Sequence, residues 1–147
     1  MDNSERYLPE DWVIPAITAY NREFFTSGEM RIQKCLSCGS VQHPPLDVCN
    51  VCQAFEFEYV TAAPHGVIDS YTIVHHPVHV SLNDRVPYNV CVIALADYPQ
   101  LKIVGNVIDV PPAEIRIGRQ VTATWAVIPG TEDQPEIILP QWKLVTS

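Results

Sequence analysis

Two Cys-x-x-Cys pairs, ten residues apart, constrain the fold of this chain more than any other feature of its 147 residues. The two pairs are Cys35 with Cys38 and Cys49 with Cys52. A Cys-x-x-Cys turn places two thiolates on one side of the backbone, and two facing turns complete the tetrahedron that zinc prefers in structural sites. Gly39 allows a turn with positive φ after the first pair, whereas Gln53 makes the matching turn after the second pair less ideal. The spacing therefore predicts one zinc ion held by the four cysteines.

Other uses of these cysteines fit the pattern less well. Disulfides are rare in the reducing cytoplasm, and a thioredoxin-type redox motif explains one Cys-x-x-Cys pair but not two. Four thiolates also bind iron, as in rubredoxin, and iron is the chemical alternative, although the short gap between the pairs favours zinc. Because four thiolates leave no open position for water or substrate, we expect a structural metal and not a catalytic one.

The residues before the cysteines predict a helix over about 14–27. Apolar residues recur there at helical spacing, Pro15 suits a first helical turn, and Gly28 is a plausible stop. The apolar stripe consists of Ile17, Tyr20, Phe24 and Phe25. We favour packing of this stripe onto the chain's own core, and packing onto a partner subunit is the alternative. An N-terminal helical segment over 1–29 is the expectation.

Two short strands flank the cysteines and complete a zinc ribbon over 30–62. Residues 30–34 alternate, and Phe55, Phe57 and Tyr59 alternate with two glutamates, which is the period of a strand with one wet face.

The remainder, residues 63–147, predicts a small β-barrel. Runs of β-branched and aromatic residues recur between turn signals at short spacing, which is typical of a closed or nearly closed barrel. The five predicted strands cover residues 67–74, 88–95, 101–108, 121–127 and 136–139. A proline-led turn at 111–114 between the third and fourth strands predicts one helical turn and fits an OB-fold. The predicted fold class is thus mainly β: an N-terminal helix, a four-cysteine zinc ribbon and a five-stranded OB-fold barrel.

Composition and charge restrict the function. Hydrophobic residues make up 47% of the chain and charged residues 18%, as in a globular protein. The net charge of −8, with nine scattered lysines and arginines, argues against nucleic acid and anionic membranes as partners. The longest apolar run, residues 90–96, is too short to cross a bilayer, and the polar, acidic start lacks a secretory signal. We expect a cytoplasmic protein.

A self-sufficient active site is not evident. His75, His76 and His79 cluster at the end of the first barrel strand, but no paired nucleophile accompanies them. His43 is expected to be a packed ring, His65 to lie in a turn, and Cys91, within an apolar strand, to be a buried structural cysteine. These patterns favour a binding or scaffolding subunit that is not an enzyme by itself.

The ordered set of motifs resembles a known family. The motifs are residues 31–39, 42–45, 48–52, 66–75, 86–88, 115–118 and 139–142. Over about residues 12–144 they resemble the bacterial and archaeal acyl-CoA-associated family that has a helical N-terminus, a zinc ribbon and an OB-fold. The resemblance implies a hetero-oligomer with a thiolase-like subunit, such as a thiolase, a retro-aldolase or an acyltransferase, with the partner carrying the chemistry.

The resemblance also implies where this partner binds. It places the loop 75–88 near the partner's acyl-CoA entrance, with His75, His76, Arg85 and Tyr88 as the candidate contacts to the partner or to acyl-CoA at the shared interface. The competing hypothesis is a stand-alone OB-fold protein that binds acyl-CoA or nucleic acid. Acyl-CoA carries several phosphates and requires converging cations, which the sequence alone does not place.

Overall fold

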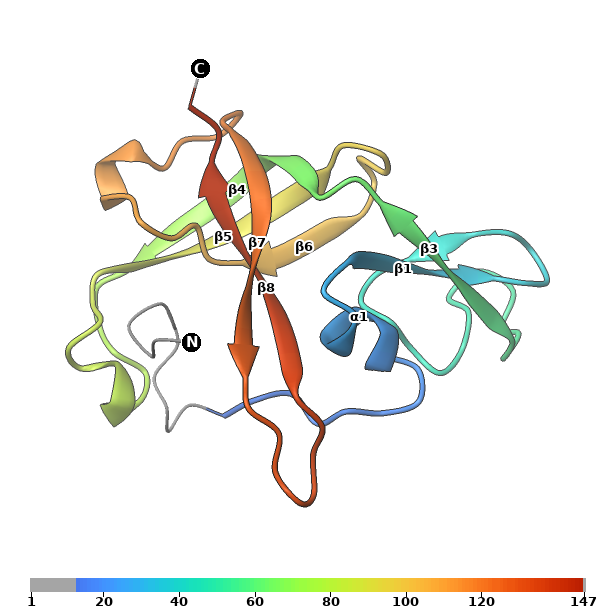
Figure 1. Cartoon of the computed structure of the whole chain (residues 1–147). Coiled ribbons are helices and arrows are strands. Elements are labelled where there is room, and N and C mark those ends of the chain that lie inside the picture. Colours follow the sequence, from blue (N-terminus) through green and yellow to red (C-terminus); the bar gives the residue numbers. More distant parts are fainter. Residues whose placement is uncertain (1–12, 147) are drawn as a thin grey trace.

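The structure is a computed structural model that describes residues 13–146. It consists of two antiparallel sheets joined by short loops, with one short helix before them (Figure 1). The elements of the N-terminal part are α1 (Arg22–Thr26), β1 (Met30–Cys35), β2 (Val41–Gln42) and β3 (Phe57–Ala62). The elements that follow are β4 (His65–Val74), the 3-10 turn η2 (Val80–Leu82), β5 (Tyr88–Leu95), β6 (Lys102–Gly105), the 3-10 turn η3 (Pro112–Glu114), β7 (Gln120–Ile128) and β8 (Ile137–Leu144).

The five-stranded sheet curls into a nearly closed barrel. Its order is β6-β5-β4-β7-β8, and the segment that follows β6 meets β8 where Val107 forms a parallel bridge with Trp142. The Ile108 N–H donates to the Trp142 carbonyl at 2.8 Å, and the Trp142 N–H donates to the Asn106 carbonyl at 3.0 Å. With η3 between β6 and β7, this arrangement confirms the predicted OB-fold.

The three-stranded sheet, ordered β2-β1-β3, is the predicted zinc ribbon, and it shares its core with the barrel. Met30 and Ile32 on β1 belong to the same buried cluster as Ile68, Ile93 and Trp142 of the barrel. Because apolar surface is buried on both sides of this junction, each part stabilises the other.

The helix is much shorter than the predicted 14–27, since α1 covers only Arg22–Thr26. Residues 13–18 have no regular structure. The Asn21 side chain accepts a hydrogen bond from the Thr18 N–H at 2.7 Å and donates to the Ala16 carbonyl at 3.0 Å. Asparagine competes in this way with helical backbone bonds and holds a turn instead. Phe24 is nevertheless buried in the chain's own core, as the favoured interpretation of the stripe expects.

The strand boundaries differ from the predicted ones at several places. β3 starts at Phe57, so Phe55 lies outside the strand predicted to contain it. β4 starts at His65, so this histidine begins a strand and does not lie in a turn. β6 ends at Gly105, earlier than predicted, whereas β8 continues through Pro140 to Leu144. Proline is tolerated there because β8 is an outer strand of the sheet. Pro140 has no N–H to donate, and no second neighbouring strand requires a hydrogen bond from it. Within residues 13–146, no helix is long and apolar enough to span a membrane.

Candidate functional site

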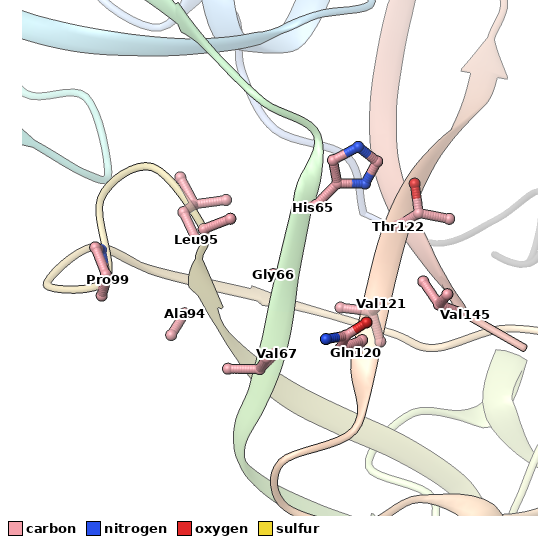
Figure 2. Close-up of a pocket in the computed structure, with 11 residues that line it drawn as sticks. His65, Gly66, Val67, Ala94, Leu95, Pro99, Gln120, Val121, Thr122 and Val145 are labelled. Carbon is pink, nitrogen blue, oxygen red and sulfur yellow. The ribbon is translucent and has the colours of Figure 1, made fainter. Parts of the chain in front are cut away.

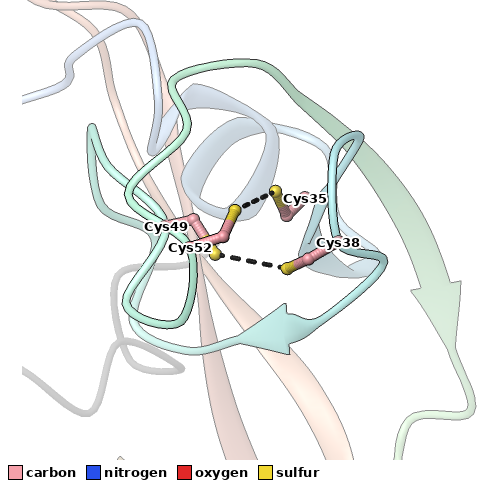
Figure 3. Close-up of side chains that lie close together, drawn as sticks. All are labelled: Cys35, Cys38, Cys49 and Cys52. Atoms are coloured by element: carbon pink, nitrogen blue, oxygen red, sulfur yellow. Dashed lines mark hydrogen bonds between the residues drawn. The ribbon is translucent and has the colours of Figure 1, made fainter.

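The four cysteines of the ribbon converge on one point. Figure 3 shows Cys35 and Cys38 facing Cys49 and Cys52. All four Sγ atoms lie within 4.8 Å of one another. Across the two pairs, the Sγ atoms of Cys35 and Cys52 are 3.6 Å apart and those of Cys38 and Cys49 are 3.7 Å apart. Four thiolates at these separations can all bind one ion, so the donor set fits a structural zinc site.

The two Cys-x-x-Cys turns repeat the same backbone geometry. The Gly39 N–H donates to the Cys35 carbonyl at 3.0 Å, and the Gln53 N–H donates to the Cys49 carbonyl at the same distance. Gly39 has a φ of 77° and Gln53 has a φ of 63°. Gln53 therefore adopts the same left-handed conformation as Gly39. A residue with a side chain is less stable in this conformation than glycine, so the second turn is the less favourable of the two.

Hydrogen bonds around Cys38 and Cys49 favour the thiolate form that binds metal, whereas burial and contacts with the other three thiols raise the pKa of Cys52 to about 12. The Cys38 Sγ lies 3.3 Å from the Ser40 hydroxyl, and hydrogen bonds from the side chain and backbone of Ser40 lower the pKa of the Cys38 thiol to about 6. Hydrogen bonds from the backbone of Cys52 and Val51 lower the pKa of Cys49. Because metal binding requires deprotonated thiols, the contacts at Cys38 and Cys49 favour metal binding, and Cys52 must lose its proton as the metal binds.

Two other predicted side chains are structural. Cys91 is fully buried in β5, its Sγ lies 3.4 Å from the Asn89 Oδ1, and burial raises its pKa to about 11, so it is not a reactive thiol. The His43 ring packs on Phe24 with the ring centroids 4.7 Å apart. Burial lowers the pKa of His43 to about 4, so the ring is neutral near pH 7.

The candidate partner contacts lie along the β4–β5 loop and its ends. His75, His76 and Arg85 are exposed, and Tyr88 is half-buried at the start of β5, where it pairs with Val74. The structure thus brings Tyr88 to the same end of the β4–β5 pair as His75.

The same loop contains a local histidine–serine contact. His79 Nδ1 lies 2.7 Å from the Ser81 hydroxyl and accepts the Ser81 N–H at 3.1 Å, which caps η2. A hydrogen bond between residues two apart that closes an exposed turn is a capping contact. It gives no reason to assign a nucleophile and base to this loop.

A pocket of about 610 Å³ is lined by residues of β4, β5 and β7 and of the loop after β5. Figure 2 shows His65 on β4 beside Thr122 on β7, with Val145 beyond them and Pro99 across the pocket. Its lining is mainly apolar and, among residues 13–146, contains no carboxylate, lysine or arginine. The pocket therefore offers shape and apolar surface, but it has no set of groups for acid–base chemistry.

Sequence reasoning missed two buried polar residues of the ribbon, Gln33 on β1 and Gln42 on β2. A signal for Gln33 is present in the sequence. It lies two residues before Cys35 on the same strand, so both side chains point to the same face of the sheet.

A zinc ribbon followed by an OB-fold defines the class of this protein. Two family models match in that order: a rubredoxin-like zinc ribbon domain of ChsH2 over residues 22–58, and the C-terminal OB-fold domain of ChsH2 over residues 59–126. A solved structure, the Ltp2-ChsH2(DUF35) aldolase, contains a chain that is 31% identical, with a TM-score of 0.72. The match covers 90% of this chain and 100% of that chain. The chain belongs to the ChsH2 (DUF35) family, which confirms the family that the motifs resemble.

Curated relatives extend beyond the matched region. The chain is 33% identical over 132 residues to a probable enoyl-CoA hydratase alpha subunit of Thermomonospora curvata, a match that covers 88% of this chain and 39% of the relative. A DUF35 domain-containing scaffold protein of Methanocaldococcus jannaschii is 29% identical over 93 residues, covering 63% of this chain and 64% of the relative. The chain thus spans about two fifths of the first relative and just under two thirds of the second.

Proposed function

We propose that this chain is a non-catalytic accessory subunit of an enzyme that acts on acyl-CoA, and that its partner has a thiolase-like fold. The observation that carries the proposal is the full-length match to the DUF35 chain of an aldolase complex. The other relatives, a probable enoyl-CoA hydratase alpha subunit and a DUF35 domain-containing scaffold protein, support the same kind of role.

The described residues are consistent with this division of labour. The candidate metal site consists of four thiolates, and such a closed site leaves no position for substrate. Of the remaining cysteine and histidine considered above, Cys91 is fully buried and the half-buried His43 ring packs on Phe24. Acyl transfer or retro-aldol cleavage requires a positioned nucleophile or base, and the partner supplies these groups in our proposal.

We assign the partner contact to the β4–β5 loop, with His75, His76, Arg85 and Tyr88 at its ends. Two valines support this assignment, because the side chains of Val78 and Val80 are 74% and 72% exposed between those residues. Apolar side chains on a loop contribute to binding when a partner covers them. The prolines Pro77 and Pro87 restrict the loop, so less conformational entropy is lost when it docks.

Co-purification tests the proposal. The tagged full chain is co-expressed with the thiolase-superfamily proteins of its own genome, one at a time, and the complex is isolated and its mass measured. We expect one such protein to form a stable hetero-oligomer. Recovery of the chain without any of them contradicts the proposed partner.

Loop variants then test the assigned contact. Val78→Asp with Val80→Asp, and separately Tyr88→Ala, should weaken the complex without loss of zinc. Ile117→Asp is the matched control, because Ile117 is similarly exposed, at 68%, on a different loop. Equal weakening by the control contradicts the assignment of the contact to this loop.

A further inference from the structure

Two glutamine side chains are buried beside the cysteine cluster, and every polar atom of their amides is hydrogen-bonded. Gln33 is 0% exposed and Gln42 is 3% exposed, and they face each other as cross-strand partners of β1 and β2. A buried amide is costly unless it is hydrogen-bonded, so a fully bonded pair defines one arrangement of the surrounding backbone.

Gln42 holds the backbone on both sides of Cys49. Its Oε1 accepts the Asn50 N–H at 2.9 Å, and its Nε2 donates to the Val48 carbonyl at 3.1 Å. Val48 and Asn50 are the immediate neighbours of Cys49 in the chain. A single side chain therefore fixes the peptide groups before and after this cysteine.

Gln33 connects this arrangement to the first pair of cysteines. Its Oε1 accepts the Gln42 Nε2 at 2.7 Å and the Leu46 N–H at 2.9 Å, while its Nε2 donates to the Leu46 carbonyl at 2.7 Å. Gln33 lies on β1, the strand that ends at Cys35. A continuous set of hydrogen bonds thus runs from the strand of one zinc ligand to the backbone around another.

We propose that Gln42, held in place by Gln33, is a positioning residue for zinc: it orients Cys49 and sets the distance between the two Cys-x-x-Cys turns before the metal binds. Outer contacts of this kind orient metal ligands, and their loss commonly lowers metal affinity about 10- to 100-fold. The inference concerns the metal site only and is independent of the proposed partner.

The test uses the full chain with Gln42→Met, which keeps the size of the side chain and removes its hydrogen bonds. Zinc affinity is measured by competition with a chromophoric chelator, and the ligand geometry is read from the visible spectrum of the Co²⁺-substituted chain. Asn89→Leu is the matched control. Asn89 is also buried, and its amide likewise bridges backbone, donating to the Val107 carbonyl and accepting the Val107 N–H at 2.8 Å each, but it lies in the barrel.

We expect Gln42→Met to lose zinc affinity about 10- to 100-fold and to shift the Co²⁺ bands, whereas Asn89→Leu keeps both within about twofold of the wild type. Wild-type affinity and spectrum in Gln42→Met overturn the proposal, as does an equal loss in Asn89→Leu. If Gln42→Met does not fold, Gln33→Met replaces it. That variant leaves the two Gln42 contacts beside Cys49 intact, and we expect a smaller loss of affinity; unchanged affinity contradicts the proposal.

Discussion

At the scale of single residues, the second Cys-x-x-Cys turn contains a residue with a strained backbone, and a substitution can relieve that strain. Gln53 has a φ of 63°, in the left-handed region that favours glycine. We predict that Gln53→Gly raises the free energy of unfolding of the zinc-loaded chain by about 1 kcal/mol, because the penalty of a side chain at this φ disappears. Denaturant unfolding measures it. Gln120→Gly, at the start of β7, is the control and should lower stability; a stability of Gln53→Gly at or below the wild type contradicts the account.

The five cysteines should separate into two classes when each is replaced by serine. Cys49→Ser removes one of four zinc ligands, so the chain should lose tight zinc binding and the ribbon should unfold, since metal binding and folding are coupled. Cys91→Ser removes an equally buried thiol from the barrel and should keep about one zinc per chain. Elemental analysis of the purified chains measures the metal. Iron in the wild type, or full zinc in Cys49→Ser, contradicts the predicted site.

His43 should make the chain less stable as the pH falls from about 6.5 to about 4. Burial lowers its pKa to about 4 in the folded state, whereas an unfolded histidine titrates near 6.5. The unfolded chain therefore binds a proton in this range that the folded chain does not, which removes up to about 3 kcal/mol of stability.

Comparison of variants isolates the contribution of His43 from acid release of the metal. Unfolding free energies of the wild type, His43→Phe and His75→Gln are measured across this pH range. His43→Phe should have the shallower pH dependence, and the exposed His75→Gln should keep the wild-type slope. Parallel curves for the wild type and His43→Phe contradict this role of the buried ring.

Some of the site could be predicted from single residues and some could not. The cysteine spacing predicts the ligand set because four thiolates in two turns have few other uses, and the apolar neighbours of Cys91 predict its burial. The role of Gln42 could not be predicted, because it depends on a loop that folds back over β2 and places Val48 and Asn50 within reach. Long-range contacts of a polar side chain leave no periodic signal in the sequence.

At the scale of elements, β4 depends on a glycine where it crosses the barrel. A Cβ atom at Gly66 would lie 2.4 Å from the Ala94 carbonyl oxygen and 2.7 Å from Ile93 Cγ2. We predict that Gly66→Ala lowers the free energy of unfolding by about 1–3 kcal/mol, because β4 and β5 must move apart. Thermal or denaturant unfolding measures this loss. The neighbouring Val67→Ala, on the exposed side of β4, should cost less; the reverse order contradicts the packing described here.

The elements also show where periodicity succeeds and fails. β5 has the predicted limits because its run of apolar, mainly β-branched residues lies between the turn signals Pro87 and Asp97. The predicted helix is too long. Its apolar residues occur at helical spacing, but the Asn21 side chain bonds the backbone of the first half in a non-helical turn. The predicted β8 is too short because a proline such as Pro140 usually marks the end of a strand. An outer strand, as β8 is here, can contain a proline.

At the scale of the whole molecule, the ribbon, the short helix and the barrel share one buried core. Phe24, Met30 and Ile32 pack into the same core as the barrel residues. Figure 1 shows α1 between the ribbon and the lower part of the β7–β8 hairpin. This shared core supports the β4–β5 loop that we propose as the partner contact.

A turnover assay tests this account most directly. The purified chain, a thiolase-fold partner and their mixture are each assayed with the partner's acyl-CoA substrate under the same conditions. The account predicts no turnover by the chain alone, and a higher kcat/KM for the mixture than for the partner alone. Turnover by the isolated chain, or a partner whose kcat/KM is unchanged by the chain, contradicts the proposed accessory role.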